Sequence, residues 1–181
     1  AALGRLRHPP QVFIAASAIG FYGNRGDEVL TEESAAGSDF LAQLSRDWEA
    51  ESARAAEFGA RVVILRFGII LAKHGGALPR MALPFRLGLG GRVGSGRQWM
   101  SWISLQDAVE MIGYALTTNL VSGAANAVTP HQVRNGEFAT DLATVLHRPA
   151  LFPAPAFALR LLLGEMADSL LLASQRVVPQ K

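Results

Sequence analysis

Cysteine is absent from this chain of 181 residues, and lysine and tyrosine occur only twice each. Without cysteine there is no disulfide framework. The chain also lacks a long uncharged apolar run: its most apolar region, residues 151–173, contains Arg160, Glu165 and Asp168, which favours packed helices over a membrane span. No segment has the pattern of a signal peptide, and we therefore expect a cytoplasmic protein without a membrane partner.

Several catalytic signatures are missing as well. The four histidines are scattered and form no H-E-x-x-H pair, so we predict no metal site. Neither the G-x-S-x-G turn of serine hydrolases nor the G-x-x-x-x-G-K-[ST] phosphate loop occurs. The composition, 50% hydrophobic and 18% charged, nevertheless allows a sizeable buried core.

Charge is divided sharply along the chain. Residues 27–57 hold nine acids and two arginines, whereas residues 59–106 hold no acid and seven basic residues. The seven are Arg61, Arg66, Lys73, Arg80, Arg86, Arg92 and Arg97. A basic loop at the rim of a cleft attracts anionic ligands such as nucleotide phosphates, and a solvated basic surface is the simpler alternative. The arginines are widely spaced and no aromatic-basic motif accompanies them, so we expect no nucleic-acid partner.

The most informative segment is V-F-I-A-A-S-A-I-G-F-Y-G, at residues 12–23. Its apolar run ends at Ser17 and gives way to a turn marked by Gly20 and Gly23, the pattern of a buried strand that delivers a hydroxyl to its carboxyl edge. Ligands bind at this edge in open α/β sheets. A second buried strand is expected at 61–67, with a helix at 39–58 between the two.

The other elements follow from periodicity and capping residues. The helix at 39–58 is expected to begin at the N-cap Ser38 and to end at Gly59. Residues 75–103 are rich in loops, and the glycine run 88–96 is expected to be a mobile loop on the substrate side. The remaining predictions are a strand at 99–103, a helix opened by Ser104 that runs to Thr118, a strand at 124–128, a helix capped by Asn135, and two short helices joined near Gly164.

The serine strand followed by Phe21-Tyr22-Gly23 resembles the extended short-chain dehydrogenase/reductases, a group related to sugar-nucleotide epimerases. The resemblance implies a downstream tyrosine that activates the substrate and a lysine four residues after it. This chain has no such pair, because Gly26 and Thr118 lie four residues after its two tyrosines. On the following helix, Phe40 and Leu44 occupy the two positions.

Further motifs narrow the resemblance to one branch. They are F-G-I-I-L at 67–71, G-L-G-G-x-x-G-S-G-R-Q at 88–98, and an apolar, proline-containing segment from residue 148 onward. Together with the missing pair, they are similar to the atypical short-chain dehydrogenases known as epimerase family proteins, some of them called SulA-like cell-division inhibitors. These proteins carry a short C-terminal domain of unknown function. The resemblance implies a Rossmann-type protein that binds NADP(H).

We therefore expect an α/β fold in two parts. The first, residues 1–130, is the C-terminal part of a Rossmann-type parallel sheet with substrate-side loops at 75–103, and the second, residues 131–181, is a small helical domain, itself truncated. No G-x-G-x-x-G turn follows a first strand, so we expect the sheet half that binds the pyrophosphate to be absent. NADP(H) is the cofactor implied for the full-length protein, with weak or absent binding by this chain alone.

Ser17 is the candidate catalytic residue. Its place before the turn favours a hydroxyl that faces the substrate or the nicotinamide over a small residue that merely packs. Tyr22 is a weaker candidate for the missing proton donor. A tyrosine in a glycine-flanked turn is more often structural, and its pKa of about 10 needs lowering by a cation.

Other residues complete the predicted site. The resemblance implies that Ser17, Ala18, Phe67, Gly68 and Ile69 contact the cofactor, with the glycine permitting close approach. On the substrate side we expect Arg92, Arg97 and Trp99, although packing alone would also explain the tryptophan.

Two function classes remain open at this stage. The first is an NADP(H)-dependent oxidoreductase or epimerase-like enzyme that acts on an unidentified small molecule without a tyrosine-lysine pair. The second is a nucleotide-binding protein with little or no turnover that serves as a sensor or protein partner. The retained serine and the basic loop favour the first, and the lost pair favours the second.

Overall fold

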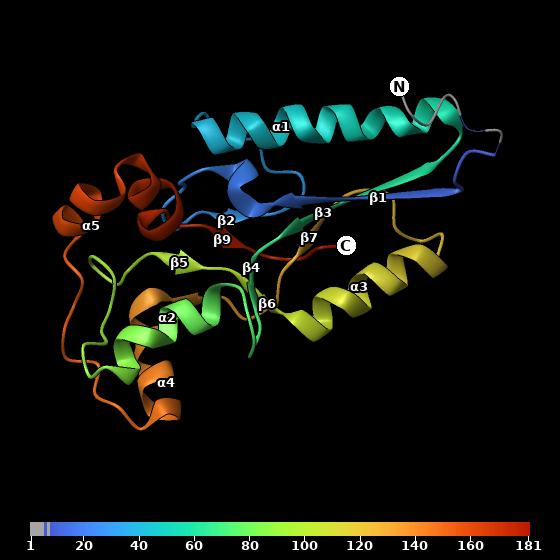
Figure 1. Ribbon diagram of the computed structural model, residues 1–181. Coiled ribbons are helices and arrows are strands. Elements are labelled where there is room, and N and C mark those ends of the chain that lie inside the picture. The colour runs from blue at the N-terminus through green and yellow to red at the C-terminus, as the bar shows by residue number, and fades with distance from the viewer. Residues whose placement is uncertain (1–5, 7) are drawn as a thin grey trace.

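A computed structural model describes residue 6 and residues 8–181, and its centre is a parallel sheet of three strands in the order β1-β3-β7 (Figure 1). The strands are β1 (Val12–Ala18), β3 (Arg61–Phe67) and β7 (Gly123–Ala127). The middle strand carries four consecutive buried residues, as expected of a strand covered on both faces. The predicted strand-helix-strand unit and the α/β fold are therefore confirmed.

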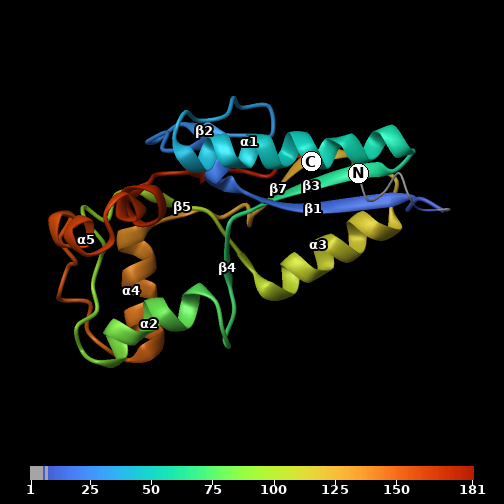
Figure 2. The same ribbon diagram turned by 45° about the horizontal axis from the view of Figure 1, so that its top comes forward.

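Helices cover both faces of this sheet (Figures 1 and 2). On one face lies α1 (Phe40–Ala53), which continues as the 3-10 helix η3 (Arg54–Phe58) and stops at Gly59 in a left-handed conformation, as predicted. The other face is covered by α3 (Leu105–Thr117), whose first turn is capped by the Ser104 hydroxyl. The predicted N-cap of α1 was wrong by one residue: Asp39, rather than Ser38, accepts the hydrogen bond from the Ala42 amide.

The region predicted as a strand at 99–103 forms two short strands that separate at Ser101. They are β5 (Trp99–Met100), which pairs with β8 (Val133–Arg134), and β6 (Trp102–Ser104), which pairs with β4 (Ile69–Leu71). Ser101 is fully buried, and its hydroxyl bonds to backbone atoms of Gln175 and Val177. The two halves pair with different partner strands, and the chain's own C-terminal segment bonds to Ser101 at the point where they part.

The expected loop region contains one helix that we did not predict, α2 (Ala77–Arg86). Pro79 falls in its first turn, where a proline removes no intrahelical hydrogen bond. The helix packs against α4 (Asn135–Leu146) through a small core that includes Phe85 and Leu142. The N-cap of α4 is Arg134 and not the predicted Asn135. The Asn135 side chain instead accepts a hydrogen bond from the Val93 amide.

The glycine run 88–96 is not the mobile loop that we expected, because backbone hydrogen bonds attach it on both sides. The amides of Phe152 and Ala154 donate to the carbonyls of Gly90 and Arg92, and the Gly94 amide donates back to the Ala154 carbonyl. A Cβ on Gly91 would stand 2.2 Å from the Phe152 oxygen. Glycine is therefore needed here for close packing against Phe152 and Pro153.

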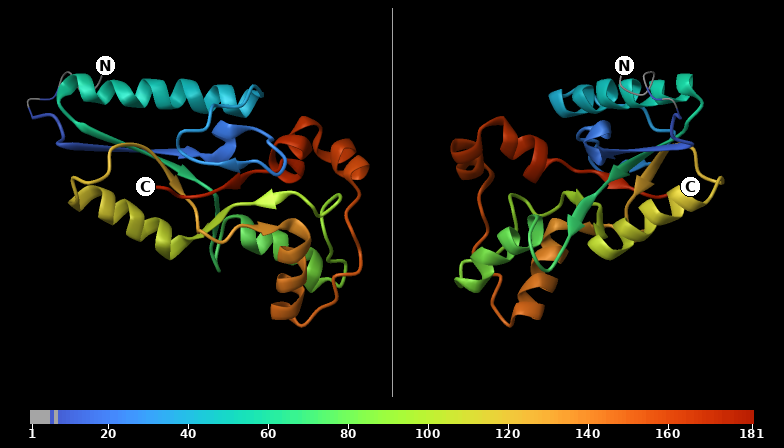
Figure 3. Two further views of the ribbon diagram at one scale, coloured as in Figure 1. Left: turned by 180° about the vertical axis from the view of Figure 1, so that it is seen from behind. Right: turned by 45° about the vertical axis from the view of Figure 1, so that its right-hand side comes forward.

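The C-terminal segment leaves the sheet and returns to it (Figure 3). Its helices are α5 (Ala156–Leu163) and a π-helical turn, η4 (Ala167–Leu172), joined at Gly164 as predicted. The last strand, β9 (Arg176–Val177), pairs in parallel with β2 (Val29–Leu30). There Val177 is buried with Leu30 and with Ile19 of the 3-10 turn η2 (Ile19–Tyr22). In the described residues, no helix is long and apolar enough to cross a bilayer.

Candidate functional site

The sheet brings most of the predicted cofactor residues to one edge. Strands β1 and β3 pair in parallel, so that Ser17 stands opposite Arg66 and Ala18 stands opposite Phe67. Both strands end there, and Gly68 follows immediately on β3. Ala18 is exposed and Ser17 is partly exposed, so the backbone and hydroxyl groups at this carboxyl edge are accessible.

Ser17 is the outermost member of a polar network that the sequence did not predict. Its hydroxyl donates a 2.6 Å hydrogen bond to Oε1 of Glu49, which reaches the strand end from α1. Arg66 donates from Nε to the same oxygen at 2.8 Å and from Nη2 to Oε2 at 2.7 Å. The glutamate is therefore held from two sides, and the serine proton points at it and away from solvent.

Tyr22 forms the inner end of this network. Its side chain is fully buried; the phenol donates to Oδ1 of Asn126 at 2.7 Å and accepts from Nη1 of Arg66 at 2.9 Å. Burial raises the pKa of the Tyr22 phenol, and the hydrogen bond and charge of Arg66 only partly offset that effect. These contacts favour the structural alternative for Tyr22, because a proton donor must reach the substrate.

Arg66 is the hub of the network and is itself almost inaccessible. Burial alone would lower the pKa of its guanidinium, but the hydrogen bonds with Glu49 and Tyr22 outweigh burial and raise it. The guanidinium carbon also lies 3.5 Å from the centroid of the Phe21 ring. Two members of the seven-residue basic block thus serve the fold. They are Arg66 here, and Arg61, which donates to the Ala115 carbonyl in the last turn of α3 and to the Val121 carbonyl beyond it.

Helix α1 presents a different face to the strand end than the sequence comparison indicated. Phe40 and Leu44 are 75% and 52% exposed, so they do not face Ser17. Leu41 instead packs toward the turn, 3.8 Å from where a Cβ on Gly20 would stand, and Ser45 and Glu49 follow it at four-residue intervals. The α1 residues on the Ser17 side are therefore one position along from Phe40 and Leu44, and neither set carries a tyrosine or lysine.

Gly68 has a role that the sequence could not indicate. A Cβ there would stand 2.6 Å from the Ser101 carbonyl oxygen and 2.9 Å from Cγ1 of Val128. Glycine at this position is thus required by the packing of β3 against the segment between β5 and β6. The expected reason, close approach of a cofactor, is not needed to explain it.

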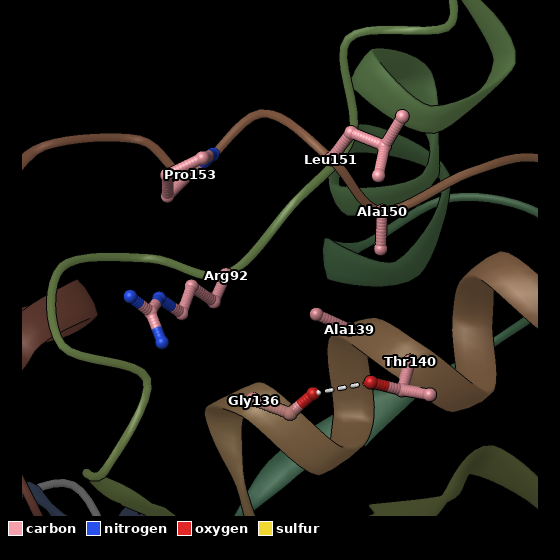
Figure 4. Close-up of a pocket in the computed structure, with 7 residues that line it drawn as sticks. All are labelled: Arg92, Gly136, Ala139, Thr140, Ala150, Leu151 and Pro153. Carbon is pink, nitrogen blue, oxygen red and sulfur yellow. Dashed lines mark hydrogen bonds between the residues drawn. The ribbon is translucent and has the colours of Figure 1, made fainter.

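Arg92 lines a cavity of about 410 Å³ between the glycine run, α4 and residues 150–153 (Figure 4). In the view of Figure 4, its side chain points away from Ala139 and Thr140 of α4, toward the side of the cavity below Pro153. The Thr140 hydroxyl is already bonded to the Gly136 carbonyl.

Trp99 belongs to a different group, in which its indole ring is surrounded by charged side chains. Of this group, the sequence indicated only Trp99 and Arg97. The guanidinium carbons of Arg134 and Arg176 each lie 4.5 Å from the centroid of the Trp99 ring. Asp27 accepts a 2.7 Å hydrogen bond from the Trp99 indole and a 3.0 Å bond from Arg134. No local motif could have predicted this group, because its members come from β5, β8, β9 and the loop after η2.

Among the described residues, no cluster of three or more histidine, aspartate or glutamate side chains could hold a metal ion. The polar groups described above lie instead around the carboxyl ends of parallel strands. A parallel sheet between two helical layers, with polar groups at the carboxyl edge of its strands, is the architecture of Rossmann-type α/β folds.

Comparison with known proteins identifies the family. Residues 2–127 match the NAD dependent epimerase/dehydratase family, and residues 154–181 match a domain of unknown function, DUF1731. The chain belongs to this epimerase/dehydratase family. It is 41% identical over 176 residues to epimerase family protein YfhF of Bacillus subtilis and 46% identical over 166 residues to epimerase family protein Mb2239 of Mycobacterium bovis. These alignments cover 97% and 92% of the chain but 57% and 55% of the relatives, so the chain spans little more than half of their length.

Solved structures agree with this assignment. Human epimerase family protein SDR39U1, crystallised with NADPH, superposes with a TM-score of 0.91 at 34% identity, over 99% of this chain and 61% of the human one. A nucleoside-diphosphate sugar epimerase from Corynebacterium glutamicum superposes with a TM-score of 0.79 at 38% identity, over 98% of this chain and 34% of that one. The predicted family and fold are therefore confirmed.

Proposed function

We propose that these residues form the substrate-side part of an NADP(H)-dependent oxidoreductase or epimerase-like protein that acts on a small molecule. The observation that carries the proposal is the Ser17 hydroxyl, partly exposed at the carboxyl edge of the sheet and held there by Glu49. The NADPH in the human SDR39U1 structure supports the choice of cofactor. We keep the cytoplasm as the expected compartment, although one plant relative is described as chloroplastic.

The residues at this edge fit the nicotinamide end of such a cofactor. Ala18, Phe67 and Ile69 provide partly exposed or exposed apolar surface at the same sheet edge, with the Ala18 and Phe67 side chains on the opposite face of the sheet from the Ser17 hydroxyl. Between residues 12 and 181, no strand is followed by the glycine-rich turn that binds a pyrophosphate. We therefore propose that the 181 residues bind NADPH weakly by themselves.

The role of Ser17 follows from its hydrogen bond. Its only proton is donated to Glu49, so the lone pairs of Oγ are the groups left for a ligand. We propose that Ser17 orients a ligand hydroxyl or amide by accepting a hydrogen bond from it, and that Glu49 and Arg66 are positioning residues. The bound cofactor would supply the hydride chemistry.

A second candidate function has one observation in its favour. The face of α1 beside Ser17 carries Leu41, Ser45 and Glu49, and hence neither a phenol nor an ammonium to move a proton. A protein of this kind would bind the nucleotide and signal its redox state, or act through a protein partner, with little turnover. It would still require the cofactor residues at the sheet edge.

Calorimetric titration of NADPH and NADH tests the proposal. It is applied to the 181-residue chain and to a form extended upstream to the length of its relatives. We expect selective NADPH binding by the extended form and little by the shorter chain. Ser17→Ala should weaken binding or turnover in the extended form, whereas Thr117→Ala, on the far end of α3, should change neither.

Each outcome decides between the functions. NADPH binding with substrate-dependent turnover that Ser17→Ala reduces supports the enzyme, and NADPH binding without turnover in a substrate screen supports the sensor. Failure of the extended form to bind either nucleotide would overturn both. Tight binding by the 181 residues alone would contradict the need for a pyrophosphate turn.

A further inference from the structure

The group around Trp99 combines cations, an indole donor and carboxylates at the surface. Arg97, Arg134 and Arg176 carry three positive charges; Asp27 pairs with the Arg134 guanidinium, and the Glu137 carboxylate accepts a hydrogen bond from the Arg134 backbone amide. The hydrogen bond from Trp99 and the charges of Arg134 and Arg97 hold the pKa of the Asp27 carboxyl below its ordinary value. The group is thus electropositive even with Asp27 in place.

Asp27 satisfies this group only in part. Its Oδ1 receives both hydrogen bonds, from the Trp99 indole and from Arg134, and its side chain remains 69% exposed. On the other side of the group, Nε of Arg176 is buried against the Trp99 ring and has no hydrogen-bond partner among the described residues, as is also true of Nε of Arg61. This atom is out of reach of a ligand, so any ligand contact of Arg176 would come from the rest of its guanidinium.

The remaining contacts fix the arginines in place and leave donors to spare. Both Arg134 and Arg176 stack on the same indole ring, which orders their side chains. Arg134 also donates from Nη1 to the Arg97 carbonyl. Guanidinium groups ordered in this way bind carboxylate or phosphate oxygens through paired, charge-assisted hydrogen bonds.

We propose that Trp99, Arg134 and Arg176 form a binding site for an oxyanion, a carboxylate or phosphate group of a small-molecule ligand, and that Asp27 occupies this site as an internal competitor. The ligand oxyanion would displace the Asp27 carboxylate and take over its hydrogen bonds from the Trp99 indole and from Arg134, with the charge of Arg176 adding to the attraction. The inference deepens the proposed function, on which it rests for the identity of the ligand as substrate.

The site is placed where it can serve the sheet edge. Asp27 lies a few residues beyond the η2 turn that begins after Ala18. Gln175, next to Arg176, donates to the carbonyls of Ile19 and Gly23 in and after that turn. Movement of Asp27 or Arg176 on ligand binding would therefore shift the turn that follows Ser17.

The three indole N–H groups make a direct test possible by nuclear magnetic resonance. Trp48 donates to the Ala16 carbonyl, Trp102 to the His131 carbonyl, and only Trp99 to Asp27. We would titrate the ¹⁵N-labelled chain with inorganic phosphate and, separately, with acetate, at an ionic strength held constant with sodium chloride. Trp99→Phe assigns the resonance.

The expected result is a saturable shift of the Trp99 indole resonance alone. Asp27→Asn should lower the concentration of phosphate at half-saturation roughly twofold to fivefold, the change expected for one solvent-exposed charge interaction. Glu28→Gln is the matched control. It removes the same charge from the next residue along the chain, a glutamate that pairs with Arg25. It should leave the midpoint unchanged, and Arg134→Gln and Arg176→Gln should raise it.

The proposal is overturned if neither anion shifts Trp99 saturably, or if Asp27→Asn and Glu28→Gln move the midpoint equally. Unchanged Trp48 and Trp102 resonances show that each variant is folded. The anion with the lower midpoint identifies the ligand group as phosphate or carboxylate. A shift of Trp99 without NADPH binding by the extended form would refute the proposed function but not this site, and the converse would refute this site alone.

Discussion

Glu49 and Arg66 form a buried ion pair with two parallel hydrogen bonds, Nε to Oε1 at 2.8 Å and Nη2 to Oε2 at 2.7 Å. Their side chains are only 9% and 6% exposed. One residue comes from α1 and the other from the middle strand β3, so the pair fixes the helix against the sheet at the level of Ser17. The same carboxylate that accepts these two bonds also accepts the serine proton.

Removing one partner of this pair should be strongly destabilising. Glu49→Leu leaves the Arg66 charge buried without a counter-ion, and we expect the free energy of unfolding to fall by about 3–5 kcal/mol. The double variant Glu49→Leu with Arg66→Met should lose less than the sum of the single changes. Urea unfolding measures the free energy of unfolding of the two single variants and of the double variant. Glu51→Leu breaks an exposed pair with Arg54 on the same part of the chain and should cost at most about 1 kcal/mol.

Replacing Tyr22 by phenylalanine should lower stability by about 1–3 kcal/mol, because Oδ1 of Asn126 loses its donor and Nη1 of Arg66 loses its acceptor in a buried place. If the structural role is right, NADPH binding by the extended form should persist. Complete loss of turnover in a variant that still binds NADPH and remains folded would restore Tyr22 as a catalytic candidate.

The raised pKa of Tyr22 also predicts alkaline destabilisation. The unfolded chain loses the phenol proton near the ordinary pKa of 10.0, whereas the folded chain retains it to higher pH. The stabilisation is therefore complete below the ordinary pKa and is lost as the pH rises from there through the folded pKa. Urea midpoints measured across this range should fall more steeply in the parent chain than in Tyr22→Phe. Parallel curves would contradict the prediction.

Gly68→Ala should be destabilising by about 1–3 kcal/mol, since its Cβ would overlap the Ser101 carbonyl and Val128. Gly113→Ala is the opposite case: nothing lies within 4 Å of the added Cβ in the middle of α3, so helix propensity should stabilise the protein by about 0.5–1 kcal/mol. Thermal unfolding distinguishes the two. Equal effects would mean that the close approach at Gly68 is not rigid.

Ser101→Ala should loosen the C-terminal strand. The Ser101 hydroxyl accepts from the Val177 amide and donates to the carbonyl oxygens of Gln175 and Val177. Its loss leaves buried backbone groups without partners, at a cost of about 1–3 kcal/mol. Hydrogen exchange of the Val177 amide should accelerate by more than that of core amides in β3. Ser95→Ala, on an exposed turn, should affect neither.

Much of the regular structure was predictable because it depends on local patterns. The strand at 61–67, the stop at Gly59 and the cap at Ser104 were read from apolar runs and capping residues, and the structure has them there. Helix α2 was missed because its two prolines favour a loop, whereas packing against α4, to which Phe85 contributes, stabilises the helix. The cap at Ser38 failed because the neighbouring Asp39 caps α1, and the cap at Asn135 failed because its side chain bonds to the Val93 amide instead.

The place of the candidate residues on the sheet was predictable, but the hydrogen-bond network around them was not. Ser17, Ala18 and Phe67 were placed at one sheet edge by the parallel-strand pattern, and the register confirms that they lie together. Glu49 and Arg66 gave no signal, because a glutamate in an acidic helix and an arginine in a basic segment look solvated in sequence. Which side of α1 faces the strand depends on helix rotation, and one residue of error exchanges Leu41 for Phe40.

The sequence by itself determined the family, the parallel strand-helix-strand unit and the absence of a tyrosine-lysine pair, because these depend on residue identity and on spacings within one or two turns or strands. Only the tertiary structure decided that Tyr22 is buried, that Glu49 holds the Ser17 proton, and that Asp27 meets Trp99. Each of these contacts joins segments at least 30 residues apart or inverts an expected exposure. Such contacts are set by how the helices and the returning C-terminal strand pack on the sheet, which no local pattern encodes.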